Sequence, residues 1–78
     1  MEKITQHEFL LLSSDLKKVD FTIDATVDGV FQLVIKIRGK EYLLCNKFYK
    51  PRSFKAIKTV ISYLKSLDIE IKNVIIKI

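Results

Sequence analysis

The residues of this sequence with the clearest chemical potential are cations and aromatic rings that lie close together in its second half. Phe48 and Tyr49 lie among them, and Ser53 is a favourable N-cap for a helix that would follow. The amino end of a helix carries partial positive charge, so each cation placed there costs about 0.3–1 kcal/mol. A bound phosphate would relieve that repulsion, because backbone amides and cationic side chains both attract it. The candidate nucleic-acid-binding residues are Lys47, Lys50, Arg52, Lys55 and Lys58.

The two aromatic rings in this run allow two interpretations. Phe48 and Tyr49 could stack on nucleic-acid bases, since every base presents a π-face to an aromatic side chain. Alternatively, both rings plug the core, the lysine stems lie along apolar surface and the loop is only solvated.

Charge is distributed unevenly along the chain. The net charge is +5, yet residues 1–35 carry three lysines against six acidic residues, whereas residues 36–78 carry eleven basic residues against three acidic ones. This asymmetry favours an anionic partner such as nucleic acid. Twelve lysines against two arginines, with abundant isoleucine, would also result from an AT-rich genome without any selection for binding.

Other reactive groups are sparse. His7 and Cys45 are the only histidine and cysteine, and a cysteine within a strand is usually a small hydrophobic residue rather than a nucleophile. Asp24 and Asp28 are ordinary carboxylates on a solvated sheet, and no cluster has metal-ligand spacing. Both glycines are needed for turns, so no glycine-rich loop can cradle a phosphate. The sequence therefore predicts a protein that is not an enzyme and has no cofactor, metal or small-molecule substrate.

Two alternating segments, residues 21–26 and 31–38, predict strands with one buried face each. A two-residue turn at Asp28-Gly29 would put their apolar residues on opposite faces. A three-residue loop that ends at Gly29 pairs Thr26 with Val30 and Phe21 with Ile35, which brings the apolar residues together. We therefore expect the second register, with Gly29 left-handed.

A third strand should follow a type II′ turn with Gly39 first, which pairs Ile37 with Tyr42. The opposite sheet face then needs a cover, either the N-terminal segment or another subunit, because it is partly apolar. The residues that make it apolar are Val30, Val34, Leu43 and Cys45.

The remaining elements are predicted from periodicity and capping. Apolar residues at helical spacing predict an amphipathic helix over residues 54–67 that packs on the meander. Thr5 and Glu8 have capping-box spacing, which favours a short helix over residues 6–13, although the apolar run at 9–12 also fits a short buried strand. Residues 70–77 form a last strand, and its two apolar faces indicate a central or dimer-paired position.

These elements make one α+β domain over residues 1–78, a three-stranded antiparallel meander followed by a helix and a final strand, with a short N-terminal helix. A chain this small has a thin margin of stability, and one cysteine excludes an internal disulfide, so a homo-oligomer is expected. A polar start and an apolar run of four residues fit neither an export signal nor a membrane span. The expected location is the cytoplasm.

One segment resembles a known group of proteins. Pro51-Arg52-Ser53-Phe54, followed by the helix that ends in Tyr63-Leu64-Lys65-Ser66-Leu67-Asp68-Ile69, resembles the C-terminal part of small plasmid-borne partition- or replication-associated proteins. Their pattern is a Pro-Arg-x-Phe start and a Leu-x-x-Leu-Gly-Ile end, and here Asp68 replaces the glycine. The resemblance covers about a quarter of the chain, implies a mobile-element context and transfers no catalytic residue.

Two functions follow as expectations. The first is a non-enzymatic module that binds nucleic acid through phosphate contacts. The alternative is a protein-interaction or dimerisation module that uses the apolar sheet face or the last strand.

Overall fold

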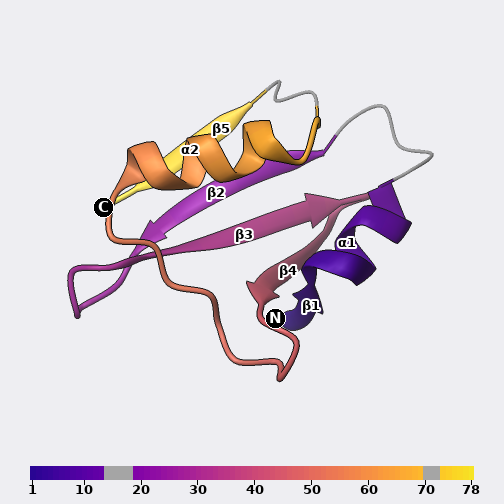
Figure 1. The fold of residues 1–78 in the computed structure, drawn as a ribbon, viewed down its shortest axis with the longest axis horizontal. Coiled ribbons are helices and arrows are strands. Elements are labelled where there is room, and N and C mark those ends of the chain that lie inside the picture. Colours follow the sequence, from indigo (N-terminus) through magenta and orange to yellow (C-terminus); the bar gives the residue numbers. More distant parts are fainter. Residues whose placement is uncertain (14–18, 70–72) are drawn as a thin grey trace.

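The computed structural model describes residues 1–13, 19–69 and 73–78 and contains a five-stranded sheet with two helices (Figure 1). The α+β class is confirmed, as is the presence of a final strand. The strand order is β1-β4-β3-β2-β5, so the predicted meander forms the centre of a larger sheet. No helix in the described ranges is long and apolar enough to cross a membrane. In chain order the elements are β1 (Glu2–Thr5), α1 (Gln6–Ser13), β2 (Asp20–Ala25), β3 (Phe31–Ile37), β4 (Lys40–Cys45), α2 (Ile57–Ser66) and β5 (Val74–Lys77).

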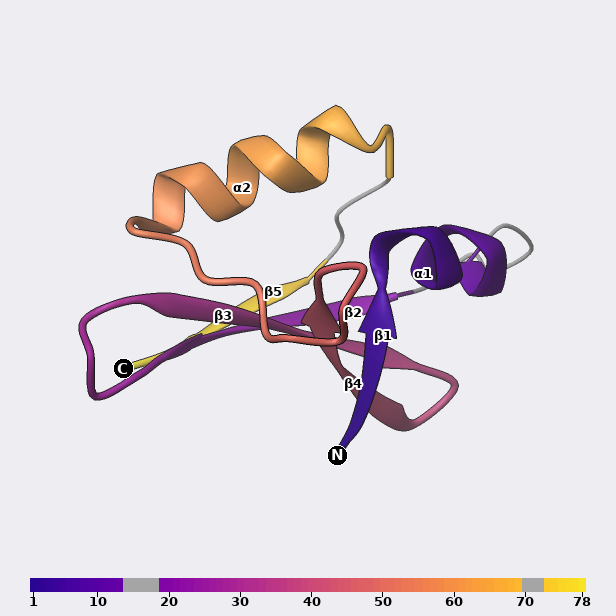
Figure 2. The same ribbon diagram turned by 60° about the horizontal axis from the view of Figure 1, so that its bottom comes forward.

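The sheet is mixed, and its topology explains why only one face is covered. β1 pairs in parallel with β4 and β5 pairs in parallel with β2, whereas β3 is antiparallel to both of its neighbours. The crossovers β1-α1-β2 and β4-α2-β5 therefore each pass over two strands in the same direction. Crossovers of one hand that run in one direction place their helices on one face. Figure 2 shows α1 and α2 on the same side of the sheet, and no helix of the described residues packs on the opposite face, the bare face.

The first hairpin has the predicted register. Phe21 pairs with Ile35, and the amide of Thr26 donates to the carbonyl of Val30 at 2.8 Å. Gly29 has φ +77°, the left-handed conformation that the three-residue loop requires.

The register of the second hairpin differs from the predicted one by two residues. Ile37 pairs with Lys40 and Ile35 pairs with Tyr42, so the predicted pairing of Ile37 with Tyr42 is wrong. The turn residues are Arg38 and Gly39, with φ +52° and +81°. Two left-handed residues in a two-residue loop are typical of a type I′ turn, which matches the twist of the strands. Because the shift is two residues, every side chain keeps its predicted face.

The N-terminal segment forms the predicted helix and an additional strand. α1 spans Gln6–Ser13, and its capping box is present. The amide of Glu8 donates to Oγ1 of Thr5 at 3.2 Å, and the amide of Thr5 donates to Oε1 of Glu8 at 3.0 Å. The preceding residues form β1, an edge strand that was not predicted.

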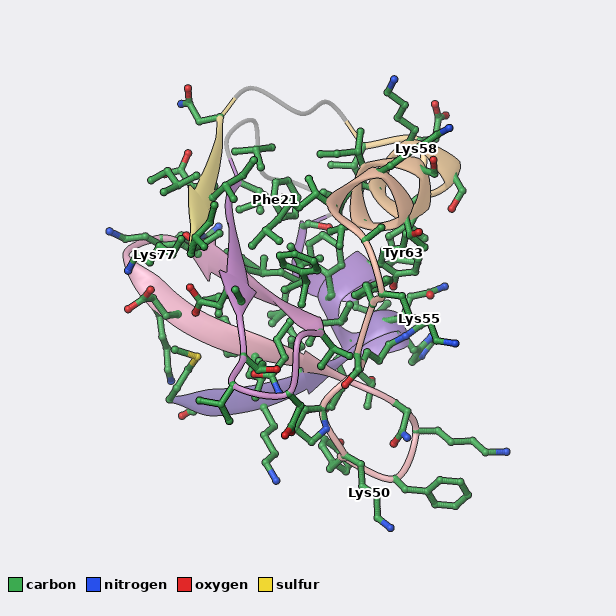
Figure 3. All side chains as sticks on the ribbon, turned by 90° about the vertical axis from the view of Figure 1, so that its left-hand side faces the viewer. Phe21, Lys50, Lys55, Lys58, Tyr63 and Lys77 are labelled. Carbon is green, nitrogen blue, oxygen red and sulfur yellow. The ribbon has the colours of Figure 1, made fainter. Side chains whose placement is uncertain are left out.

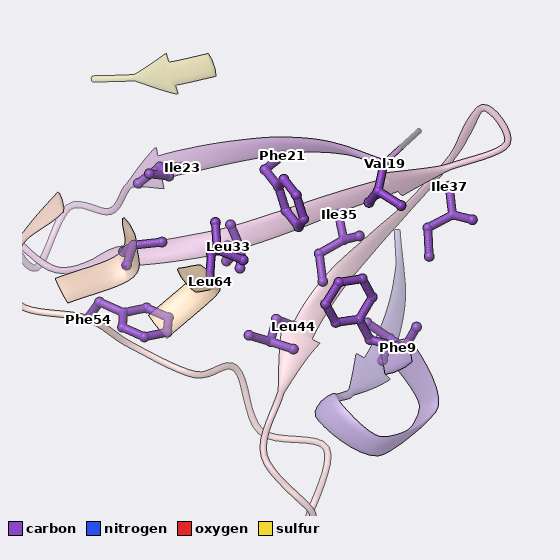
Figure 4. Packing of buried hydrophobic residues seen from close by; sticks show 12 residues of the cluster. Phe9, Val19, Phe21, Ile23, Leu33, Ile35, Ile37, Leu44, Phe54 and Leu64 are labelled. Atoms are coloured by element: carbon purple, nitrogen blue, oxygen red, sulfur yellow. The ribbon is translucent and has the colours of Figure 1, made fainter. Parts of the chain in front are cut away.

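The hydrophobic core lies between the sheet and the two helices (Figure 4). Phe9 from α1 meets Phe21 from β2 edge to face, with ring centroids 6.1 Å apart. Val60 and Leu64 are the fully buried residues of α2. The core cluster contains Ile4, Phe9, Val19, Phe21, Ile23, Leu33, Ile35, Ile37, Leu44, Phe54, Val60 and Leu64.

The bare face does not receive the predicted cover from the N-terminal segment, because β1 lies beside β4 and α1 packs on the other face. Val34 is nevertheless buried, since it lies on the central strand between Leu43 and Thr22. The last strand also differs from its prediction. β5 is an edge strand, so a central position is wrong, and residues 70–72 of the predicted strand lie outside the described residues.

Candidate nucleic-acid interface

The approach to α2 is extended, which corrects the premise of a helix that starts after Ser53. α2 begins at Ile57, and its N-cap is Ala56, which makes no side-chain capping bond. Residues 51–54 instead run along the sheet. Phe54 exchanges two backbone hydrogen bonds with Phe31, at 2.7 and 2.8 Å, which holds this segment in an extended conformation. Lys47, Lys50 and Arg52 therefore do not adjoin the amino end of α2.

Residues 46–50 form a tight turn, the basic turn, that is held by Asn46. The Oδ1 atom of Asn46 accepts from the amides of Phe48 and Lys50, at 2.9 and 3.1 Å. The backbone of Asn46 bonds to Tyr49 and Lys50 at 2.9 and 2.8 Å. Tyr49 has φ +60°, a left-handed conformation that costs a non-glycine residue about 1 kcal/mol or more. The basic turn is therefore a fixed structure that presents its side chains outward.

Phe48 and Tyr49 are the two exposed aromatic residues of the eight in the chain. Phe48 is 69% exposed and Tyr49 is 46% exposed, so the interpretation that both rings plug the core is wrong. The hydroxyl of Tyr49 donates to Oε2 of Glu8 at 3.0 Å, which ties the basic turn to α1. This bond raises the pKa of Tyr49, and the pKa of Glu8 is lowered, first by its bond from the Thr5 amide and then by that from Tyr49.

The four candidate lysines are all exposed, and among the described residues none of them forms an ion pair with a carboxylate. The Nζ atom of Lys47 lies 5.2 Å from the ring centroid of Phe48, a cation–π contact. Figure 3 shows Lys58, Lys55 and Lys50 at successive levels along one side of the molecule, from α2 to the basic turn. The structure therefore places Lys47 and Lys50 in the same turn, and Lys55 and Lys58 further along the side that Lys50 occupies.

Arg52 differs from the lysines because its guanidinium points inward. Its Nη1 atom donates to Oε1 of Gln6 at 3.3 Å and to the hydroxyl of Tyr63 at 3.4 Å. The guanidinium also lies 4.7 Å from the ring centroid of Tyr63. Burial raises the pKa of the Tyr63 hydroxyl, against the smaller opposing effect of Arg52. Arg52 thus connects the start of α1 to α2, and neither Gln6 nor Tyr63 was predicted as its partner.

A hollow of about 530 Å³ lies between the basic turn and the start of α1. His7 and Cys45 both line it, but Cys45 is buried and its Sγ donates to the carbonyl of Leu43 at 3.3 Å. Burial raises the pKa of the Cys45 thiol, which disfavours the nucleophilic thiolate. In the ranges that the structure describes, no group of three or more histidine, cysteine or acidic residues could hold a metal ion.

No protein-family model matches this chain, and neither a curated protein nor a solved structure matches it. The resemblance of residues 51–69 to plasmid-borne proteins therefore stays a prediction.

Proposed function

We propose that this protein is a non-enzymatic module that binds nucleic acid, with a preference for unpaired bases, through the basic turn. One observation carries the proposal. The chain exposes two of its eight aromatic residues, and these two are consecutive and flanked by Lys47 and Lys50. Exposed aromatic rings interleaved with cations are typical of surfaces that bind single strands.

Each side chain of the basic turn has a distinct role in this proposal. Phe48 stacks on a base, a contact worth about 1–3 kcal/mol. Lys47 and Lys50 contact the phosphates on either side, and Lys55 and Lys58 continue the positive track toward α2. Residues 42–67 contain no acidic residue, and the carboxylate that lies beside the basic turn, that of Glu8, accepts a hydrogen bond from the Tyr49 hydroxyl.

The rigidity of the basic turn supports the proposal. The bonds to Asn46 fix the backbone before any ligand arrives, so little conformational entropy is lost on binding. Arg52 contributes by position rather than by contact, because its bonds to Gln6 and Tyr63 hold the segment that follows the turn. The mobile-element context and cytoplasmic location expected from the sequence are settings in which such a module would meet nucleic acid.

Fluorescence anisotropy tests the proposal, with a single-stranded oligonucleotide and its duplex as ligands in about 50 to 200 mM salt. We expect the single strand to bind more tightly and affinity to fall with salt. Phe48→Ala should weaken binding about 5- to 150-fold without a change in salt slope, since it removes stacking and no charge. Replacing both Lys47 and Lys50 by Gln should reduce the slope by about 1.4 for a single strand.

Two variants serve as controls. Val27→Ala removes an apolar side chain from a different exposed loop, and Lys3→Gln removes a charge from β1, so neither should alter binding. The proposal would be refuted by an absence of binding at low salt. It would also be refuted if Phe48→Ala and Val27→Ala behaved alike.

A further inference from the structure

The outer edge of β5 combines unpaired backbone with exposed apolar side chains. β5 pairs with β2 on one side and is the last strand of the sheet on the other. Ile75 is 55% exposed, Ile76 is 46% exposed and the adjoining Ile78 is fully exposed. An apolar edge of this kind is a template for another strand.

The ladder with β2 determines which backbone groups of β5 face outward. The amide of Phe21 donates to the carbonyl of Asn73 at 3.3 Å, and Phe21 pairs with Val74. In a parallel ladder, alternate residues of a strand bond to the same neighbour, so Asn73 and Ile75 bond toward β2. The amides and carbonyls of Val74 and Ile76 then point away from the sheet, where they are free to bond to a further strand.

We propose that a second copy of this chain occupies this edge, with the two β5 strands antiparallel about a two-fold axis at Ile75. Val74 then faces the partner's Ile76 and exchanges backbone hydrogen bonds with it. Ile75 meets the partner's Ile75 on the bare face at the close spacing of a non-hydrogen-bonded pair. This proposal stands independently of nucleic-acid binding.

Charge complementarity selects this register over its nearest alternative. The Oδ1 atom of Asp20 is buried and has no hydrogen-bond partner among the described residues. Asp20 and Asn73 line a hollow of about 450 Å³ on the bare face, and Lys77, Lys36 and Glu41 lie at the same hollow. Lys36 is opposite Asp20 on β3 and opposite Glu41 on β4, so it lies between the two carboxylates. In the proposed register Lys77 faces the partner's Asn73, and the partner's Asp20 is one strand further. That separation is two strand spacings, about 10 Å, which a lysine and an aspartate side chain together can span.

An alternative register centred on Ile76 lacks this match. It places Lys77 opposite the partner's Ile75 and does not bring Lys77 to the partner's Asp20, whose neighbour on β3 in its own copy is Lys36. The proposed register instead joins apolar residues to apolar residues and brings Lys77 toward the partner's Asp20 carboxylate, twice by symmetry. The strand is therefore complementary to itself, which favours a second copy over an unrelated strand.

Analytical ultracentrifugation between about 1 μM and 1 mM should show a dimer whose fraction rises with concentration. Lys77→Glu should raise the dimer dissociation constant about tenfold, because it loses two attractions and creates two repulsions. The matched control is Lys65→Glu on α2, which changes net charge equally and should leave the dimer intact. Adding Asp20→Lys to Lys77→Glu should restore association.

Cross-linking tests the register in a Cys45→Ala background. Ile75→Cys places two thiols on directly opposed residues with Cα atoms about 4.5 Å apart, within the range for a disulfide. Ile76→Cys is the matched control. Residue 76 faces the partner's Val74 rather than the partner's residue 76, so this variant should form little disulfide. A monomer at every concentration would overturn the proposal and leave the edge to a strand of another protein. Preferential cross-linking through Ile76→Cys, or equal effects of Lys77→Glu and Lys65→Glu, would overturn it as well.

Discussion

The two edges of the sheet differ in how they meet solvent. β1 carries Glu2 and Lys3 on its exposed surface, and Oε1 of Glu2 pairs with Nζ of Lys40 at 2.8 Å. β5, at the opposite edge in Figure 1, exposes Ile75 and Ile76 beside one charged residue, Lys77. Charged residues protect an edge because adding a strand would desolvate them, whereas isoleucine favours that addition. The sheet is therefore protected at one edge only. Two copies can join through their β5 strands, but the protected β1 edges disfavour the addition of further copies.

The two edges also differ in how firmly they join the core. The β1–α1 unit contributes Ile4 and Phe9, which are almost completely buried. In β5 only Val74 is partly buried and packs against the core cluster, and the other three residues are exposed. The protected edge thus depends on the monomer's own core, and the apolar edge retains surface for a partner.

The largest expected effect tests this difference in anchoring. Phe9→Ala removes the buried residue of α1 and its contact with Phe21, and should cost about 3–5 kcal/mol. Ile76→Ala should cost the monomer about 1 kcal/mol or less, since Ile76 is half exposed. Urea unfolding at low protein concentration measures both. Equal losses would show that β5 is as firmly anchored as the β1–α1 unit.

A second variant tests whether charge is what protects β1. Replacing Glu2 by Val and Lys3 by Ile gives β1 an apolar edge, so each copy could pair at both edges. Pairing at two different edges need not close, and we expect species larger than a dimer in sedimentation velocity. Glu2→Gln with Lys3→Gln is the polar control and should not enlarge the assembly. If the apolar variant also gave no larger species, the short length of β1 rather than its charge would protect it.

The sequence determined which side chains face the core more reliably than it determined pairing. The first hairpin was predictable because a one-residue slip would have moved Phe21 and Ile23 to solvent. The register of the second hairpin was not predictable in this way, since a two-residue slip leaves every side chain on the same face of the sheet. Its register depends on Arg38 in a left-handed conformation, which is uncommon for arginine.

Contacts between distant parts of the chain account for the other errors. β1 is a four-residue parallel strand whose partner is about forty residues away, so no local pattern reveals it. Ser53 is a favourable N-cap, but the backbone bonds between Phe54 and Phe31 hold the chain extended past it. Lys47 and Lys50 were predictable as exposed cations, whereas the inward position of Arg52 depends on Gln6 and Tyr63.

The smallest effect concerns the junction that fixes the protected edge, where Glu8 caps α1. Hydrogen bonds from the Thr5 amide and the Tyr49 hydroxyl favour its carboxylate, so the pKa of Glu8 in the folded chain lies below its ordinary 4.5. The stabilisation is therefore complete above the ordinary pKa and is lost as pH falls through the lower folded value.

Glu8→Gln should therefore lie below the wild-type protein in stability by a constant amount above about pH 5.5, and the difference should shrink as pH falls below 4.5. Thermal unfolding followed by circular dichroism across this range measures the difference. Tyr49→Phe removes one of the two bonds and keeps the Thr5 cap, so its pH-dependent loss should be smaller than that of Glu8→Gln. If the difference between Glu8→Gln and the wild type did not change with pH, the carboxylate charge would not stabilise the β1–α1 junction. The connection between the basic turn and the protected edge would then depend on hydrogen-bond geometry alone.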